Sequence, residues 1–259
     1  MTKFDFGENW KNFSKDILSE QRVSEATEST GYLLSSKIIS GKRVLDIGCG
    51  SGIFSIAFIK LGAEKVIATD ISVNSIETAR QNAEIYLSPE EAARIKFLQD
   101  DILNTSLEEK KGQFDIVYSW GVLHHTGEMH KAVRIAADFV KKDGYLVVAI
   151  YNHHWSSGIW GHTKNFYNTL PEIGKKIMVY AFYPIIYIAK LLVTGSRPHK
   201  SERGMDFYYN IIDWLGGYPY EYAKKEEIYK FVNDMGFVCQ KTIKAGVPTG
   251  CNQFVFVKI

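Results

Sequence analysis

The stretch Val44-Leu45-Asp46-Ile47-Gly48-Cys49-Gly50-Ser51-Gly52 decides the fold of this chain. Apolar residues lead into Asp46, glycine then occupies every second position, and the apolar-periodic segment 53–60 follows. This order predicts a buried strand, a tight turn and the start of a helix. Glycine permits positive φ and close approach of a ligand to the backbone, and the free N–H groups of a helix start attract anions. The stretch therefore predicts a loop that holds a nucleotide-like cofactor, although a purely structural turn is the alternative.

The residue after this loop helps to choose between two cofactors. A dinucleotide-binding loop has the form G-x-G-x-x-G/A, so a small residue should stand at position 53. The chain has Ile53 there, and a bulky β-branched side chain would hold the helix away from the strand. The pattern Asp-x-Gly-x-Gly-x-Gly at 46–52 instead resembles motif I of class I S-adenosylmethionine (SAM)-dependent methyltransferases.

Short apolar segments alternate with helical patterns along much of the chain. This alternation predicts an α/β fold, a doubly wound, mostly parallel sheet with helices on both faces. The resemblance implies a Rossmann-like sheet of seven strands that ends in an antiparallel hairpin. The expected strands are 43–48, 65–70, 95–100, 114–120, 145–151, 237–244 and 252–259, and the expected helices are 12–17, 23–39, 53–61, 75–83, 129–140 and 225–235.

Acidic residues end the second and third expected strands, where ligands bind in such sheets. Asp70 is suited to accept hydrogen bonds from ribose hydroxyls, because Ser72 and Asn74 can cap the next helix instead. The alternative for Asp70 is that capping role. After the third strand, Asp101 and Ile102 resemble the family's next motif, in which an Asp binds the adenine amino group and an apolar neighbour packs on the ring. The alternative is an acidic turn.

The fourth expected strand continues into Gly121-Val122-Leu123-His124-His125. The run from Phe114 to His125 resembles motif IV of small-molecule class I methyltransferases. That resemblance implies that Ser119, Trp120 and Gly121 border the methionyl part of SAM. It also makes His124 and His125 the candidate catalytic residues, since a histidine near neutral pKa can act as a base. The alternative is that both are hydrogen-bonded packing residues.

The resemblance therefore implies SAM as the cofactor and a set of residues that contact it. Phe6, Trp10 and Phe13 of the N-terminal arm are expected to close over the site, and Cys49 is expected to fill space within the loop. The complete expected cofactor-binding set is Asp46, Gly48, Cys49, Gly50, Gly52, Asp70, Ile71, Asp101, Ile102, Ser119, Trp120, Gly121 and Trp10.

Four segments are expected along the chain: an N-terminal helical arm (1–40), a SAM-binding core (41–151), an aromatic-rich insertion (152–224), and a final helix and hairpin (225–259). The insertion, called the lid below, is too long for a simple connection and can cover the strand ends. Its run 177–189 is apolar but shorter than the roughly 20 residues that span a bilayer, and Pro184 interrupts it. Burial on the core is the favoured interpretation. The alternatives are a wall for an apolar acceptor and contact with a membrane surface or second subunit.

Composition sets the remaining limits. The 31 Lys and Arg nearly balance the 29 Asp and Glu, so no nucleic-acid partner is expected. The three cysteines are widely spaced, the first residues lack a signal peptide, and no metal-ligand spacing is complete, so we expect a cytoplasmic protein without a metal. We expect a SAM-dependent methyltransferase whose methyl acceptor is a small, partly apolar metabolite. A homodimer is among the expected assemblies. The alternatives are a non-catalytic SAM-binding protein, a protein or RNA methyltransferase, and an NAD(P)-binding protein.

Overall fold

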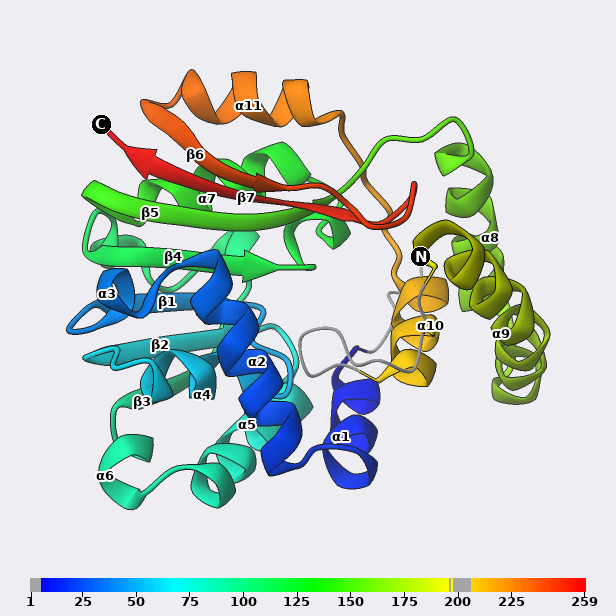
Figure 1. The fold of residues 1–259 in the computed structure, drawn as a ribbon, viewed down its shortest axis with the longest axis horizontal. Coiled ribbons are helices and arrows are strands. Elements are labelled where there is room, and N and C mark those ends of the chain that lie inside the picture. Colours follow the sequence, from blue (N-terminus) through cyan, green and yellow to red (C-terminus); the bar gives the residue numbers. More distant parts are fainter. Residues whose placement is uncertain (1–5, 196, 198–205) are drawn as a thin grey trace.

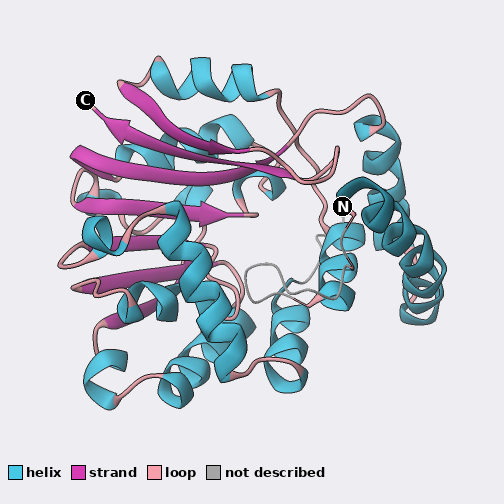
Figure 2. Ribbon diagram, viewed as in Figure 1, coloured by secondary structure: helices cyan, strands magenta, loops and turns pink. Residues whose placement is uncertain are grey.

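The computed structural model describes residues 6–195, 197 and 206–259, so parts of the expected N-terminal arm and lid lie outside the described residues. Its centre is one seven-stranded sheet in the order β3-β2-β1-β4-β5-β7-β6 (Figure 2). β7 alone runs antiparallel to its two neighbours, β5 and β6. This arrangement confirms the expected fold class. The strands are β1 Arg43–Ile47, β2 Lys65–Asp70, β3 Ile95–Gln99, β4 Phe114–Trp120, β5 Val140–Tyr151, β6 Phe237–Ile243 and β7 Cys251–Lys258.

Helices cover both faces of the sheet and bury one apolar layer on each side. One layer contains residues of α2, α4 and α5, and the other contains residues of α7 and α11. The strand order changes direction between β1 and β4, and ligands bind at this switch point in such folds. The core helices are α2 Glu20–Leu33, α3 Ser36–Ile39, α4 Ile53–Lys60, α5 Val73–Tyr86, α6 Pro89–Ala92, α7 Met129–Asp138 and α11 Lys225–Asn233. Short 3₁₀ turns are η1 Ile102–Asn104, η2 Glu108–Lys110 and η3 Leu123–His125.

Several elements differ from those expected. The helix expected at 23–39 is divided into α2 and α3, because Leu34 has an extended backbone that ends α2. The first helix, α1, runs Phe6–Asp16 rather than starting at residue 12. Phe6, Trp10 and Phe13 are spaced at helical intervals, so the aromatic cluster is itself part of the helix. β5 begins at Val140, which pairs with Phe114, rather than at residue 145. The strand accommodates Asp143 at a φ of +59°, a left-handed conformation that the apolar pattern did not indicate.

Three helices of the lid lie beyond the carboxyl ends of the parallel strands: α8 Ser157–Thr169, α9 Glu172–Thr194 and α10 Phe207–Gly216 (Figure 1). They share a small apolar cluster of their own, separate from the two layers on the sheet. The expected burial of 177–189 on the core is wrong, because Val179 is the one buried residue of α9. Pro184 lies inside the helix on its exposed side, where water can reach the carbonyl that proline leaves without a donor.

The length of this apolar segment was also underestimated. Among the described residues, α9 is the one helix that is long and apolar enough to cross a membrane by length and composition alone. The helix has 23 residues because it continues past Lys190 through Leu191, Leu192 and Val193. The helix that contains the run 177–189 is therefore longer than that run alone indicated.

Candidate active site

The glycine loop is tied to the end of the neighbouring strand. The amides of Gly48 and Cys49 both donate to the carbonyl oxygen of Thr69, at 2.7 and 2.9 Å. Gly48, Gly50 and Gly52 have φ values of +74°, +54° and +76°, in the left-handed region that favours glycine. Gly52 precedes α4, and a Cβ there would lie 2.8 Å from Cβ of Ala79 on α5. The spacing of the glycines thus sets both the turn and the close approach of two helices.

Two side chains of the motif lie beneath the loop. Asp46 is buried and accepts a 2.5 Å hydrogen bond from the hydroxyl of Ser55, which joins β1 to α4. Burial raises the pKa of Asp46 to about 7, although the Ser55 hydrogen bond opposes the rise. Cys49 is buried too, and burial raises the pKa of its thiol well above the usual value. Cys49 is therefore an inert space-filling residue here, and contact between Asp46 and a methionyl group stays a prediction.

Asp70 ends β2 beside the glycine loop. One carboxylate oxygen accepts from the amide of Gly50 at 3.0 Å, and the other accepts from Ser72 at 2.9 Å. Ser72 caps α5, as expected, because its hydroxyl accepts from the amide of Ser75. These two backbone bonds fix the carboxylate at the end of β2, where a ribose would meet an acceptor-only group. The next side chain, Ile71, is apolar yet 56% exposed, which offers a surface for an aromatic base.

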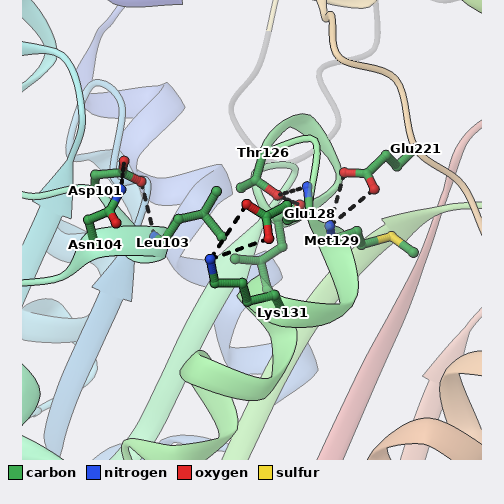
Figure 3. Close-up of polar contacts among 9 residues, drawn as sticks. Asp101, Leu103, Asn104, Thr126, Glu128, Met129, Lys131 and Glu221 are labelled. Carbon is green, nitrogen blue, oxygen red and sulfur yellow. Dashed lines mark hydrogen bonds and ion pairs between the residues drawn. The ribbon is translucent and has the colours of Figure 1, made fainter.

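Asp100 and Asp101 have different surroundings after β3. Asp100 accepts hydrogen bonds from the Thr105 hydroxyl and from the amide and hydroxyl of Ser106, at 2.5 to 2.9 Å. Among the described residues, Asp101 accepts from the Leu103 amide and the Asn104 side chain, at 3.0 and 3.2 Å (Figure 3). Asp101 is thus the acid with more free acceptor capacity. This geometry supports the choice of Asp101 over Asp100 as the adenine contact, which stays a prediction.

The segment after β4 lies directly against the glycine loop. Ser119 is buried and donates to the carbonyl of Ile47 at 3.0 Å, which joins β4 to β1. A Cβ on Gly48 would overlap the side chain of Val122. Gly121 has a φ of +76°, and a Cβ there would meet no atom within 4 Å, so open space lies beside its backbone. Trp120, the last residue of β4, is partly buried.

Helix α1 closes over this edge of the sheet. The indole of Trp10 rests on Gly50, so that a Cβ on this glycine would lie 2.8 Å from the ring. The ring of Phe6 lies 5.2 Å from that of His125. Phe13, in contrast, is fully buried and packs on Tyr209 of α10. The structure therefore brings Phe6 and Trp10 to the expected site and places Phe13 in the packing between the arm and the lid.

The two candidate catalytic histidines form a stacked pair, with ring centroids 4.5 Å apart. His124 is fully buried, its ring lies 4.1 Å from that of Tyr151, and neither ring nitrogen completes a hydrogen bond of ordinary geometry with a described residue. His125 is partly buried, and its Nδ1 lies 2.7 Å from the carbonyl oxygen of Pro219. Since a carbonyl only accepts, this contact assigns the Nδ1–H tautomer and leaves Nε2 as an acceptor.

The expected near-neutral pKa is found at neither histidine. Burial, with the charge of Lys164, lowers the pKa of His125 to about 3, against the opposing effect of the Pro219 carbonyl. Burial and the neighbouring His125 lower the pKa of His124 well below its usual value. Both rings are therefore neutral at physiological pH in this closed arrangement.

Lys164 of α8 is a site residue that the sequence analysis missed. Its side chain is fully buried, and its ammonium lies 4.7 Å from the ring of Trp214, 4.8 Å from Tyr220 and 5.5 Å from Tyr151. It donates to the carbonyl of Trp214. Burial lowers the pKa of Lys164 to about 7. The sequence pattern that could have indicated this position is a row at helical spacing, formed by Trp160, Lys164, Tyr167 and Asn168. This row puts the lysine on the aromatic face of the helix.

Asp213 and Glu221 connect the lid to the rest of the site. Burial raises the pKa of Asp213 to about 7, while a 2.7 Å hydrogen bond from Asn9 of α1 lowers it. Both carboxylate oxygens of Glu221 accept from the amide of Met129, at 3.1 and 3.0 Å, at the start of α7 (Figure 3). The amide of Glu221 donates to the carbonyl of His124 at 3.0 Å. Asp213 thus links the lid to α1. Glu221 links it to α7 through its carboxylate and to His124 through its backbone amide.

The residues at this edge fit a nucleoside that carries an amino-acid tail. The backbone of the glycine loop is bare enough for the Trp10 ring to rest on Gly50, Asp70 supplies acceptors, and the exposed Ile71 supplies an apolar surface. Within the described ranges, no three His, Cys, Asp or Glu side chains are grouped closely enough to hold an ion.

Comparison with known proteins identifies the family. Residues 38–206 match the family model described as "Methyltransferase domain", which covers more than half of the chain. The chain therefore belongs to this family and has the class I SAM-dependent methyltransferase fold. Magnesium protoporphyrin IX methyltransferase from Synechocystis PCC 6803, solved with bound S-adenosylhomocysteine (SAH), has a TM-score of 0.61 and 17% identity over 97% of this chain and 94% of that one. A putative methyltransferase from Listeria monocytogenes has a TM-score of 0.55 and 16% identity over 91% and 99%.

Curated relatives match only in part. Ubiquinone biosynthesis O-methyltransferase from Rhodopseudomonas palustris (strain HaA2) is 34% identical over 125 residues, which are 48% of this chain and 45% of that protein. Ribosomal protein L11 methyltransferase from Vibrio campbellii is 59% identical over 51 residues, which are 20% and 17% of the two chains. The chain thus spans less than half of the length of these relatives, which act on very different acceptors by name.

Proposed function

We propose that this chain binds SAM along the glycine loop and transfers its methyl group to an oxygen of a small, partly apolar metabolite. The observation that carries the proposal is the meeting of three features at the carboxyl ends of β1, β2 and β4: the glycine loop, the Asp70 carboxylate and the His124–His125 pair. Family membership supports the cofactor. The relatives named O-methyltransferases support an oxygen acceptor.

SAM, when bound, supplies an activated methyl group on a sulfonium, and the protein supplies position, exclusion of water and a proton acceptor. Asp70 and Asp101 would hold the ribose and adenine, and Gly48, Gly50 and Gly52 would hold the methionyl end. The lid and α1 exclude water from the acceptor side, where aromatic rings surround Lys164.

Two groups can accept a proton from an oxygen acceptor in this enclosure. The pKa of Lys164 is about 7, so a large fraction of its amine is neutral at physiological pH. The Nε2 of His125 is an acceptor as well, but the low pKa of this histidine makes it the weaker base while the site is closed. The aromatic surroundings of Lys164 favour a small, partly apolar acceptor over a protein or RNA. A cytoplasmic location is part of this proposal.

Calorimetry with SAH tests the cofactor site. Asp70→Asn should weaken SAH binding about 10- to 100-fold, because a hydrogen bond to a charged group is worth roughly 1.5–3 kcal/mol. The matched control is Asp138→Asn at the far end of α7, which should leave the affinity unchanged. Equal affinity for Asp70→Asn and wild type would remove the ribose assignment.

Methyl transfer from isotopically labelled SAM into a metabolite extract then tests the activity. Labelled product from wild type, and none from Asp70→Asn at low SAM concentration, is the expected result. Tight SAH binding with no labelled small molecule, but with label in protein or RNA fractions, would overturn the proposed acceptor class.

A further inference from the structure

Helix α9 is long, apolar and mostly exposed. Its most apolar 18-residue window has a mean hydropathy of 1.8, yet only 6% of that window is buried. In Figures 1 and 2, α9 is the outermost lid helix, on the side turned away from the sheet. A water-exposed helix normally carries polar residues on its outer face. α9 therefore presents a surface that monomeric proteins rarely leave uncovered.

The two sides of α9 have different surroundings. The inner side packs on α10 and Tyr167 of α8 through partly buried side chains, among them Met178, Phe182, Tyr183, Ile186 and Tyr187. The outer side is exposed, and its large apolar residues repeat mainly at intervals of three or four. We call these residues the outer stripe: Ile173, Ile177, Tyr180, Ile185, Ile188, Leu192 and Val193, all between 55% and 79% exposed. The helix is thus held to the lid by one side and leaves a continuous apolar row on the other.

The sequence that carries the outer stripe is basic beyond Glu172. From 173 to 201 the sequence has no acidic residue, and it has five basic ones, Lys175, Lys176, Lys190, Arg197 and Lys200. The chain as a whole carries a net charge of only +2, so this segment is far more basic than the rest. Glu172, at the helix start, pairs with Lys175 at 2.8 Å. The ammonium of Lys190 lies 5.8 Å from the ring of Phe207 on the inner side, and Lys176 is exposed. An apolar row within a basic segment matches a surface that is apolar inside and anionic outside.

We propose that the outer stripe of α9 lies in the interface of a membrane that contains anionic lipids, parallel to its plane. A spanning arrangement does not fit, because the lysine-free stretch 177–189 is about 20 Å long at 1.5 Å per residue, against a hydrocarbon core of about 30 Å. The packing of the inner side on α10 also keeps half of the helix in contact with protein.

A second copy of this chain is a poorer occupant for the outer stripe. In a two-fold interface the same patch meets itself, so the lysines of one α9 would face the lysines of the other across a short distance. Like charges at an interface are unfavourable, whereas anionic headgroups would neutralise them. RNA would satisfy the cations but would leave the exposed isoleucine and leucine side chains in water.

Vesicle flotation of the 259-residue chain tests the proposal without any need for the methyl acceptor or for activity. The chain should float with phosphatidylcholine vesicles that contain 30% phosphatidylglycerol and remain largely unbound with pure phosphatidylcholine. The triple variant Ile177→Ser/Ile185→Ser/Leu192→Ser should lower the partition coefficient at least tenfold. The matched control changes three exposed aliphatic residues elsewhere, Ile85→Ser/Val238→Ser/Ile259→Ser, and should bind like wild type.

A charge variant separates the two contributions. Lys175→Gln/Lys176→Gln/Lys190→Gln should lower binding to the anionic vesicles at least fivefold, and raised salt should have a similar effect on wild type. Circular dichroism and a thermal melt establish that each variant is folded. Absence of flotation with any vesicle, equal binding by the stripe and control variants, or a dimer in solution that the stripe variant abolishes would each overturn the proposal. Resistance of the bound chain to extraction at high salt and pH would overturn the interfacial orientation.

Discussion

Replacement of Lys164 by methionine should change how the free energy of unfolding depends on pH. The pKa of this buried lysine falls from 10.5 to about 7 on folding. Between those values the unfolded chain binds a proton that the folded chain does not, so wild-type stability rises with pH across this window. At about 1.4 kcal/mol for each pKa unit, the full penalty, which is reached below pH 7, is roughly 5 kcal/mol. Methionine cannot be charged, so Lys164→Met removes this slope.

The size of the effect can be worked out at two pH values. At pH 7.5 the wild type carries about 4 kcal/mol of the penalty, and at pH 9.5 about 1.4 kcal/mol. Against this, Lys164→Met leaves the Trp214 carbonyl without its donor, which costs about 1–3 kcal/mol at both. The variant should therefore be the more stable protein at pH 7.5 and should lose this advantage by pH 9.5.

Urea unfolding at pH 7.5, 8.5 and 9.5, followed by circular dichroism, measures both proteins. The quantity that decides is the difference between wild type and variant, because other groups that titrate in this range cancel in it. Lys176→Met, on the exposed side of α9, is the control and should give a curve parallel to wild type. If the wild-type and Lys164→Met curves are also parallel, the amine stays charged in the folded protein, and its role as a near-neutral base is refuted.

Three further changes have definite expected outcomes. Gly52→Ala should lower the unfolding free energy by about 1–3 kcal/mol in a urea titration, because it forces a φ of +76° on alanine and crowds α5; unchanged stability would contradict this geometry. Glu221→Gln should cost about 1 kcal/mol, since the Met129 amide loses a charged acceptor at the start of α7, and thermal melts that coincide would exclude the cap. Asn9→Ala should raise the pKa of Asp213 above about 7 in a ¹³C carboxyl titration by NMR, because it removes the hydrogen bond that favours the ionised form.

The parts of the site that follow from local sequence were predictable. The glycine loop needs only its own backbone conformation and the strand before it, and the positive φ values at Gly48, Gly50 and Gly52 agree with that interpretation. The acids at the strand ends could also be placed, because parallel strands bring their carboxyl ends to one edge. At the end of β3 the sequence placed two acids side by side, Asp100 and Asp101, as candidates for the adenine contact. The hydrogen bonds of Asp100 with Thr105 and Ser106 distinguish it from Asp101.

The acceptor side depends on contacts between distant segments, and the sequence could not predict it. The burial of Lys164 requires Tyr151, Trp214 and Tyr220, which come from the end of β5 and from the far end of the lid. A lysine is normally exposed, so no local rule indicates this enclosure. The exposure of α9 was missed for a related reason. When both sides of a helix are apolar, the pattern does not indicate which side packs on protein.

The contacts of α1 imply that cofactor binding and lid position are coupled. Trp10 rests on Gly50 of the cofactor loop, Phe6 packs on His125, and Asn9 holds Asp213 of α10 at 2.7 Å. These three residues lie within two turns of one helix, so they move as a unit. A ligand on the glycine loop must either pack under Trp10 or displace it, and only displacement would strain the Asn9–Asp213 contact. A cofactor that binds better to one position of Trp10, either on Gly50 or displaced from it, would shift α1 toward that position, and α1 contacts the lid.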